Sequence, residues 1–477
     1  RWSGSVSRRS FLAASATCAA WTIVPRSVLG GPKFVAPSEK VNVALVGAGG
    51  QGRTNSRALF QEPDTQIVAV ADPIQQFSLD AFYYKGLGGR VPVAKEIAEH
   101  YGKQSPGFRC KEYEDFRVML EKEKGIDAVL CATPDHLHAY VSLRSMRAGK
   151  HVFCEKPLTH NIAEARLVGQ VAKQSGVATQ MGNIGHSRDG IRQTCEWIWD
   201  GAIGEVHEVH AWTPHPVWPQ GLDRPKETPP VPDTLNWDLW LGPAPERPYH
   251  PWYLPRVWRG WIDFGTGGLG DMGCHIFDHI VTSLKLGPPQ TVEATASTFV
   301  QPGGGRAKWK NTESWPQAQI VTFHFPAREG FPPLKLMWYD GGLMPPRPQE
   351  LEDGRRMGDD CGGAIYVGTK GTIITGSHGA NGVRLIPESR MQEYKQPAKT
   401  LPRVDNHYQE WIRACKGDGK TGAPFDYAGP LTETVLLGNV ALRSGERIRW
   451  DSAAMRVTNC DAANEYLQRA YRNGWSL

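Results

Sequence analysis

The sequence lacks the cysteine pattern of a metal-bound or disulfide-stapled domain. Its nine cysteines are spread singly along 477 residues, and no two of them form a CxxC pair. Zinc ribbons and small disulfide frameworks both need closely spaced cysteines, so the sequence argues against both classes. Cys131 and Cys154 lie in apolar, strand-like runs, where a cysteine most simply serves as a small core side chain.

Strong charge and long apolar runs are also missing. The chain has 54 Lys and Arg against 49 Asp and Glu, a formal net charge of +5, without a long basic run. A nucleic-acid partner requires a concentrated basic surface, so we expect none. Beyond the N-terminus no window approaches the roughly 20 apolar residues that span a bilayer, so we expect no stable membrane insertion of the mature protein. The length predicts two domains, and no solenoid-length repeat is present.

The first 38 residues have the pattern of an export signal and linker. SRRSFL at 7–12 precedes the small and apolar stretch AASATCAAWTIVP, and the arrangement resembles a twin-arginine signal. The alternative is an amphipathic first helix. Cys18 follows Ser-Ala-Thr, which is a poor lipobox and favours cleavage over lipidation. We therefore expect residues 1–38 to direct the folded protein to the periplasm.

Buried strands alternate with helical segments in the first half of the chain. Apolar runs rich in β-branched residues at 41–46, 67–71, 127–133 and 151–155 are typical of strands covered on both faces. Helical patterns separate them. We therefore predict an α/β fold with a doubly wound parallel sheet over residues 39–181.

The pattern changes from residue 182 onward. Alternating strand-like pieces are joined by long loops rich in proline and glycine, which predicts an α+β domain over 182–477 with a largely antiparallel open sheet. These pieces lie at 205–212, 291–297, 318–325 and 334–340. Helical patterns at 404–416 and 460–472 predict helices near the C-terminus.

A glycine-rich loop, GAGGQG at 47–52, follows the first strand and opens a helix. Such glycines let the backbone approach a pyrophosphate at the positive end of the helix. Asp72, at the end of the second strand, can accept hydrogen bonds from ribose hydroxyls and would repel a 2′-phosphate. The pattern predicts a Rossmann domain that binds NAD rather than NADP through Gly47, Gly49, Gln51, Gly52 and Asp72. The alternative is a glycine-rich turn without a nucleotide.

Three further motifs carry a resemblance to a known family. They are ATPDHLH at 132–138, AGKHV at 148–152 and CEKPL at 154–158. With these motifs the chain resembles the Gfo/Idh/MocA oxidoreductases, named after glucose-fructose oxidoreductase, inositol dehydrogenase and a rhizopine catabolism protein. The resemblance runs from about residue 40 to the C-terminus. It implies a dimer or tetramer formed through the exposed face of the second domain's sheet.

The resemblance also implies which residues form the site. Cofactor contacts are expected from Thr133, Pro134, His138, Glu155 and Lys156. Asp135 stands where many members have Asn. In the family the lysine of Glu-Lys-Pro, here Lys156, reaches the substrate beside the nicotinamide. The family's Asp and His, four apart on a helix of the second domain, match Asp271 and His275.

His275 lies in the stretch GLGDMGCHIFDHI at 268–280. From Gly273 onward the apolar residues form one helical stripe, and His275 faces away from it. We expect His275 in the first turn, where the helix dipole favours the neutral imidazole. Asp271 is expected to cap the helix and to fix the tautomer of the ring. The alternative is a structural histidine.

These residues predict the removal of a hydride from a carbinol carbon to the nicotinamide. His275 is the predicted base for the hydroxyl proton, and Lys156 would stabilise the developing alkoxide charge. Further candidates for binding substrate hydroxyls are Asn183, His186, Arg259 and Asp278.

Two other groups of residues leave alternatives open. Five histidines could suggest a metal site: His207, His210, His215, His250 and His279. However, His207 and His210 are three apart in a predicted strand and point to opposite faces, so we predict no metal. Seven of the 17 tryptophans lie between residues 212 and 261. Their rings suit the C–H faces of a sugar, but aromatic-rich loops also use such rings as a core.

The predicted export and the predicted chemistry leave three functions. An exported dehydrogenase would hold its cofactor tightly and regenerate it in place. It could oxidise one sugar, glycoside or polyol and reduce another. Alternatively, it could use transient oxidation for elimination, epimerisation or glycosidic cleavage without net redox change. A non-catalytic binding protein is the third option, against which the presence of Lys156, Asp271 and His275 argues. The residues do not separate the first two.

Overall fold

The computed structural model describes residues 35–36, 39–298, 312–404 and 406–477. The predicted twin-arginine signal lies outside the described residues. Residues Val41–Leu477 form one unit, which contains all the elements discussed below. None of the helices in the described ranges is long and apolar enough to cross a membrane.

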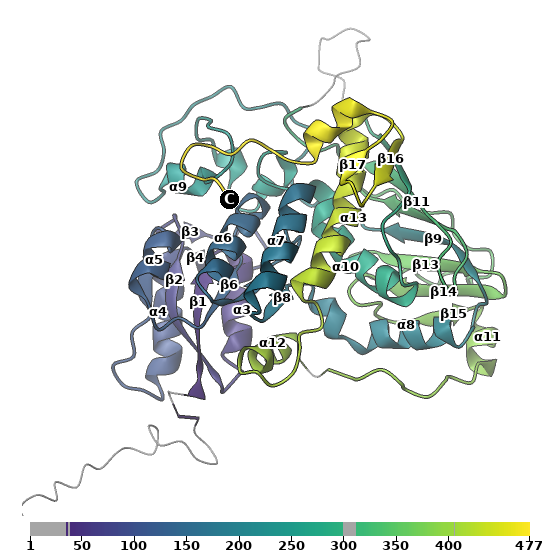
Figure 1. Cartoon of the computed structure of the whole chain (residues 1–477), viewed down its shortest axis with the longest axis horizontal. Helices are drawn as coiled ribbons and strands as arrows, with labels where there is room; N and C mark the ends of the chain where they lie inside the picture. The colour runs from purple at the N-terminus through teal and green to yellow at the C-terminus, as the bar shows by residue number, and fades with distance from the viewer. Residues whose placement is uncertain (1–34, 37–38, 299–311, 405) are drawn as a thin grey trace, which may run out of the picture. The chain divides into compact units, whose positions relative to one another are not determined.

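Six parallel strands form the N-terminal sheet in the order β5-β2-β1-β6-β7-β8 (Figure 1). The strands are β1 (Val41–Val46), β2 (Thr65–Ala71), β5 (Lys111–Tyr113), β6 (Ala128–Cys131), β7 (His151–Cys154) and β8 (Thr179–Met181). A short hairpin of β3 (Phe77–Ser78) and β4 (Leu87–Gly88) follows β2. The doubly wound parallel sheet expected from the sequence is confirmed.

Helices cover both faces of this sheet. One face packs against α3 (Gly50–Leu59), α4 (Arg90–Gly102) and α12 (His407–Cys415), and the other against α5 (Phe116–Lys122), α6 (Asp135–Arg147) and α7 (Ile162–Ser175). In β1, Val43 and Leu45 face the first layer, whereas Ala44 and Val46 face the second. From β1 the chain adds β2 and β5 on one side of the sheet and then β6, β7 and β8 on the other, so the order of the strands reverses between β1 and β6. In doubly wound folds, ligands bind beside such a switch point, at the carboxyl ends of the strands.

The second sheet has nine strands in the order β15-β14-β13-β9-β12-β11-β10-β16-β17. The strands are β9 (Val206–Trp212), β10 (Thr291–Ala296), β11 (Gln319–Phe325), β12 (Leu334–Tyr339), β13 (Gly363–Gly368), β14 (Gly371–Gly376), β15 (Arg384–Ile386), β16 (Ile448–Asp451) and β17 (Arg456–Val457). Its pairs are antiparallel except for β9 and β12. The predicted α+β architecture is therefore confirmed.

Helices pack on one face of the second sheet. These are α8 (Asp189–Trp199), α10 (Gly267–Ser283) and α13 (Phe425–Ser444). Phe277 of α10 meets Phe323 and Trp338 edge to face. The opposite face carries half-buried apolar side chains such as Ile320 and Met337. The smaller helices are η2 (Ile184–Ser187), α9 (Trp237–Leu241), η3 (Pro251–Tyr253), η4 (Val257–Gly260), α11 (Glu388–Glu393) and η5 (Asp461–Tyr466).

Two helical features near the C-terminus differ from the expectation. The sequence pattern gave no prediction of α13, because this helix is buried on nearly all sides and contains Pro430, so it lacks an amphipathic pattern. The helix predicted at 460–472 is wrong: η5 ends at Tyr466, and the residues after it are irregular. There Arg469 and Tyr471 both bind Glu164 of α7, so contacts with the N-terminal half replace helical hydrogen bonds.

The two sheets share one core. A single cluster of buried side chains includes residues of both sheets, and α13 packs on α7 as well as on α10. A second connection, which we name the 73–75/234–236 bridge, joins the loop after β2 to the second half. In it, Gln75 N donates to Thr234 O at 2.7 Å and Asn236 N donates to Pro73 O at 3.0 Å. β8 ends at Met181, and the domain boundary between residues 181 and 182 stays a prediction.

Candidate active site

A cavity of about 560 Å³ lies at the carboxyl ends of the N-terminal strands and is closed by the second half of the chain. Twelve of the predicted site residues line it: Gly47, Gly49, Gln51, Asp72, Thr133, Pro134, His138, Glu155, Lys156, Arg259, Asp271 and His275. The other four, Gly52, Asn183, His186 and Asp278, are not among the lining residues. The structure therefore brings the three predicted catalytic residues and all the predicted cofactor residues except Gly52 to one place.

The glycine loop has the close contacts that a dinucleotide cradle requires. Gly47 has φ +93°, and a Cβ there would lie 2.6 Å from the carbonyl carbon of Ala132. A Cβ on Gly52 would lie 2.0 Å from Gly47 O, so Gly52 allows α3 to pack against the loop. α3 begins at Gly50 with no acidic residue in its first turn. Its N-terminus can therefore receive an external anion such as a pyrophosphate.

Asp72 lies at the end of β2 on the cavity wall. Its carboxylate accepts hydrogen bonds from Ala48 N at 2.7 Å and Ile74 N at 2.8 Å. Burial nevertheless raises the pKa of Asp72 to about 6. A carboxylate at this position has lone pairs left for ribose hydroxyls.

Glu155 and Asp135 fix the neighbouring walls. Glu155 Oε1 accepts hydrogen bonds from Asn55 Nδ2 at 2.8 Å and Gln51 Nε2 at 3.2 Å, while burial raises the pKa of Glu155. Asp135 accepts hydrogen bonds from Thr266 N and Oγ1 at 3.1 and 2.7 Å. Asp135 therefore fastens the loop after β6 to the start of α10.

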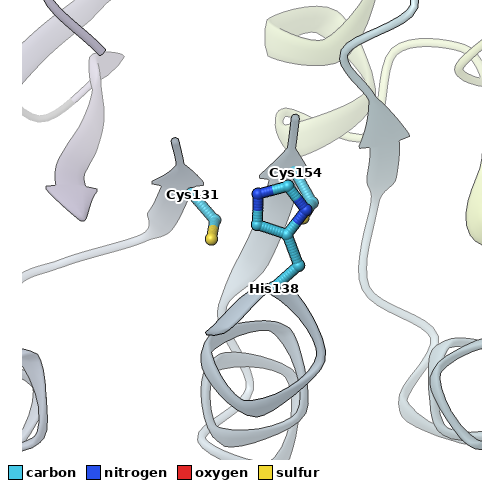
Figure 2. A group of neighbouring side chains, drawn as sticks. All are labelled: Cys131, His138 and Cys154. Carbon is cyan, nitrogen blue, oxygen red and sulfur yellow. The ribbon is translucent and has the colours of Figure 1, made fainter. Parts of the chain in front are cut away.

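His138 forms a buried cluster with Cys131 and Cys154 (Figure 2). Within the described residues this is the only group of three whose ligand atoms, all within 4.8 Å of one another, could hold a metal ion. However, His138 Nδ1 lies 2.7 Å from Pro157 O and Nε2 lies 2.9 Å from Thr133 O. An imidazole ring can donate hydrogen bonds to carbonyl oxygens at both nitrogens only when it is protonated. A protonated ring pairs with a neighbouring thiolate, whereas it has no lone pair for a metal ion. Burial opposes that charge, but Cys131 and Asp135 raise the pKa of His138.

Lys156 and Asp271 form an ion pair across the cavity. Lys156 Nζ donates to Asp271 Oδ1 at 2.9 Å and to Asp271 O at 2.7 Å. Arg259 Nε also donates to Asp271 Oδ1, at 3.0 Å, and His215 Nδ1 lies 3.6 Å from Oδ2. Burial disfavours the Asp271 carboxylate, but Lys156, Arg259 and His215 together hold its pKa well below the usual range. Asp271 therefore orients two cations toward the cavity.

The expectation that Asp271 caps the helix is wrong. α10 begins at Gly267, and Thr266 occupies the N-cap position without a side-chain cap bond. His275 therefore lies in the third turn rather than the first. The glycines that precede His275 belong to the helix itself. They are glycines because a larger side chain would collide with its neighbours in the first turns. A Cβ on Gly270 would lie 1.9 Å from Thr266 Oγ1.

His275 is kept neutral by burial rather than by the helix dipole. Burial lowers its pKa well below the usual value, and His378 and Lys156 add to this effect. The His275 and His378 rings lie 4.2 Å apart between centroids, at 38° to each other. His275 Nδ1 is buried without a hydrogen-bond partner among the described residues. Asp271 therefore does not fix its tautomer.

Three predicted substrate residues, Asn183, His186 and Asp278, lie outside the cavity lining. His186 Nδ1 lies 2.8 Å from Asp278 Oδ1, and Tyr427 Oη donates to the same oxygen at 2.5 Å. Asp278 and Asn183 are fully buried. Their part in substrate binding stays a prediction.

The tryptophans of the 212–261 segment divide between wall and core. Trp218, Trp240 and Trp258 line the cavity. Arg259 lies over the ring of Trp258, 4.3 Å from its centroid. Trp237, Trp240, Trp258 and Trp261 belong to an aromatic cluster with Phe264. The use of these rings as a core is therefore observed, and stacking of the cavity tryptophans on a sugar stays a prediction.

Two cavity residues were not predicted as part of the site from the sequence: His378, and His215, which was considered only as a metal ligand. His378 lies in a turn between β14 and β15, where no local motif marks it. His215 follows β9 in a proline-rich loop. Only the fold of the second sheet brings these two residues beside His275 and Asp271.

The parallel sheet, the glycine loop and the acid after β2 define a dinucleotide-binding protein. Two models of one family match the chain: "Oxidoreductase family, NAD-binding Rossmann fold" over residues 41–183 and "Oxidoreductase family, C-terminal alpha/beta domain" over 207–313. Together they cover more than half of the chain. The chain belongs to this Gfo/Idh/MocA oxidoreductase family.

Similar proteins agree with this assignment. Levoglucosan dehydrogenase of Pseudarthrobacter phenanthrenivorans is 24% identical over 279 residues, 56% of this chain and 58% of that protein. A glycosyl hydrolase family 109 protein of Stenotrophomonas maltophilia is 27% identical over 209 residues, 44% of this chain and 42% of that protein. The matched segments thus span about half the length of these curated relatives. The WlbA dehydrogenase of Bordetella pertussis, solved with NADH and UDP-GlcNAcA, has a TM-score of 0.54 at 18% identity, covering 86% of this chain and 99% of that one, which shows a shared fold.

Proposed function

We propose that this protein is an NAD-dependent oxidoreductase that acts on a carbinol of a sugar, glycoside or polyol. The observation that carries the proposal is the convergence of Lys156 and His275 on the cavity that the glycine loop also lines. The name of the relative from Pseudarthrobacter phenanthrenivorans, levoglucosan dehydrogenase, supports a carbohydrate substrate.

The cavity fits NAD by the contacts described above. The loop from Gly47 to Gly52 would hold the pyrophosphate, and Asp72 would accept hydrogen bonds from the ribose hydroxyls. Bound NAD supplies a nicotinamide carbon that accepts a hydride. Pro73 and Ile74 of the 73–75/234–236 bridge line the cavity next to Asp72. The bridge fastens this wall to the second half of the chain, which supports a cofactor that stays bound between turnovers.

The chain's own residues handle the proton. Neutral His275 takes the proton of the substrate hydroxyl, and the Lys156 ammonium stabilises the negative charge that develops on that oxygen. Asp271 holds Lys156 in place through the 2.9 Å hydrogen bond. A base of low pKa suffices, because the hydroxyl becomes strongly acidic as the hydride departs.

The test is single-turnover reduction of bound NAD, followed by the near-ultraviolet absorbance of reduced nicotinamide. A panel of polyols and glycosides should reduce the cofactor in the wild-type protein. His275→Ala should abolish the reduction and leave the NAD content unchanged. Near-normal rates in His275→Ala would show that another group is the base.

The second candidate is transient oxidation without net redox change. Its support is the relative from Stenotrophomonas maltophilia, a glycosyl hydrolase family 109 protein. Lasting reduction by one sugar and reoxidation by another would favour the oxidoreductase. Bond cleavage with no lasting reduction would favour the second candidate.

Export and assembly complete the proposal. We infer from SRRSFL at 7–12 that the folded protein is exported to the periplasm by the twin-arginine route. Replacing Arg8 and Arg9 by lysine should retain the protein in the cytoplasm on cell fractionation. The half-buried apolar side chains on the open face of the second sheet support a homodimer or homotetramer, which light scattering would detect.

A further inference from the structure

His378 is a second histidine of the cavity, and a chain of hydrogen bonds fixes its tautomer. Ser377 Oγ lies 2.8 Å from His378 Nδ1 and 2.8 Å from Asp359 Oδ1. The hydroxyl has one proton, which the carboxylate receives, so Ser377 Oγ must accept a hydrogen bond from His378 Nδ1. His378 Nε2 is then a bare lone pair.

The surroundings hold this chain rigidly. The Asp359 carboxylate also accepts hydrogen bonds from Ser377 N and Cys361 N, both at 2.9 Å. A Cβ on Gly376 would lie 2.5 Å from Asp359 Oδ2, so this glycine leaves room for the carboxylate. The turn itself rests on the loop after β8, where a Cβ on Gly379 would lie 2.1 Å from Gly185 O. His378 is therefore positioned from both sides.

Nε2 of His378 is left for the cavity. No hydrogen bond to this atom is found among the described residues, and His378 lines the cavity beside His275. Burial lowers the pKa of His378 to about 4, so the ring is neutral near pH 7. The carbinol needs only one base, for which His275 is the candidate. The site therefore holds one proton acceptor more than the oxidation of an alcohol uses.

A carbonyl on the substrate creates the second acidic proton. Once a ring carbinol is oxidised, the C–H bond on the adjacent carbon becomes acidic, because the resulting enolate charge spreads onto the carbonyl oxygen. Lys156 is placed to stabilise that oxygen. The 4.2 Å separation of the two imidazole rings matches neighbouring positions of one sugar ring better than two separate ligands.

We propose that His378 is a second general base, which removes the proton from the carbon next to the oxidised carbinol. The C–H bond breaks, its electron pair forms the enolate, and His378 Nε2 receives the proton. Return of a proton to carbon gives exchange or epimerisation, and departure of a group from the next carbon gives elimination. Asp359 and Ser377 are positioning residues that stabilise the cationic ring. This inference rests on the proposed function, since the carbonyl arises from that oxidation.

The test is proton exchange into ring ketones, a reaction that needs no hydride transfer. Purified protein is incubated in heavy water with 1,5-anhydrofructose or 2-keto-myo-inositol, and NMR follows deuterium at the carbon beside the carbonyl. Wild type should exceed the spontaneous rate. His378→Gln should lower the enzymatic rate by about 100-fold, the usual contribution of a general base. His324→Gln, which alters a partly exposed histidine of β11 away from the cavity lining, is the matched control and should not change the rate.

Asp359→Asn is the second variant. Its amide can donate to Ser377 Oγ, which reverses the hydrogen bonds and places a proton on His378 Nε2. The exchange rate should fall although the ring remains in place, and a purely structural role would not predict this loss. Melting temperature and NAD content confirm that each variant is folded.

Each outcome decides the matter. Exchange that persists in His378→Gln, exchange lost only in His275→Gln, or no exchange above the spontaneous rate in wild type would overturn the proposal. Wild-type protein that exchanges ketone protons but is never reduced by any alcohol would instead contradict the proposed function.

Discussion

At the scale of single residues, the ion pair between Lys156 and Asp271 fixes the position of the ammonium group in the site. A lysine with two hydrogen bonds to one residue is held at a defined place, so its ammonium can stabilise charge without reorganisation. Lys156→Ala should lower the rate of NAD reduction by about 100- to 1,000-fold, as for the loss of one oxyanion donor.

The control for Lys156→Ala is Lys335→Ala, which removes a half-exposed lysine of the second sheet that does not line the cavity. Stopped-flow absorbance would measure both rates. Lys156→Ala should retain bound NAD, and an unchanged rate of reduction would remove Lys156 from the mechanism.

Asp72 should make NAD binding depend on pH. The ionised carboxylate accepts hydrogen bonds from the ribose, so affinity should be full above the pKa of about 6 and fall as the pH drops through it. The folded pKa is raised above the ordinary 3.8, so the cofactor-free protein should also lose stability as the pH rises between these values.

Asp72→Asn is expected to remove both effects and to weaken the preference for NAD over NADP. Fluorescence titration with NAD at about pH 5 and about pH 7.5 would measure the first effect. Equal pH dependence in wild type and Asp72→Asn would assign the titration to another group.

At the scale of secondary structure, small residues let α10 and α13 approach closely. A Cβ on Gly438 of α13 would lie 2.5 Å from Leu269 Cδ2 and 3.2 Å from Phe323 Cζ. Helix propensity favours alanine over glycine by about 1 kcal/mol, but overpacking a tight core costs about 1–3 kcal/mol. Gly438→Ala should therefore lower the free energy of unfolding.

The matched control is Gly287→Ala, an exposed position with no atom within 4 Å of the added Cβ. Its free energy of unfolding should be unchanged or slightly higher. Urea denaturation would compare the two variants. Equal stability would mean that Leu269 moves aside at no cost.

The same elements show how far the sequence could predict the structure. Four strands of the first sheet, β1, β2, β6 and β7, were predictable because each is an apolar run ended by a turn, and the glycine loop lies directly after β1. β5 is Lys-Glu-Tyr and carries no such run. α13 was not predictable, because burial on all sides removes the period that marks a helix. Within the site, Lys156 and His275 lie in sequence motifs of the family, so they could be predicted. His378 lies in no such motif. Its place in the site depends on how β14 and β15 fold beside α10, so it could not be predicted.

At the scale of the whole molecule, the shared core predicts cooperative unfolding. α13 packs on α7 of the first half and on α10 of the second, and one buried cluster includes both sheets. Multidomain proteins often unfold in several steps, whereas this arrangement leaves neither half a complete core of its own. Calorimetry should therefore show one transition, with the van't Hoff enthalpy equal to the calorimetric enthalpy.

Fluorescence of the tryptophans and far-ultraviolet circular dichroism provide the check. Their transitions should coincide. Two separated transitions would show that the halves are independent in spite of the common core.

The bridge between residues 73–75 and 234–236 has a kinetic consequence under the proposed function. If the bound dinucleotide is not exchanged, the enzyme alternates between a form with oxidised cofactor and a form with reduced cofactor. With one cavity for both sugars, the oxidised product must depart before the acceptor can enter. Steady-state plots should then give the parallel lines of a ping-pong scheme, and an excess of either sugar should inhibit by occupying the form that belongs to the other.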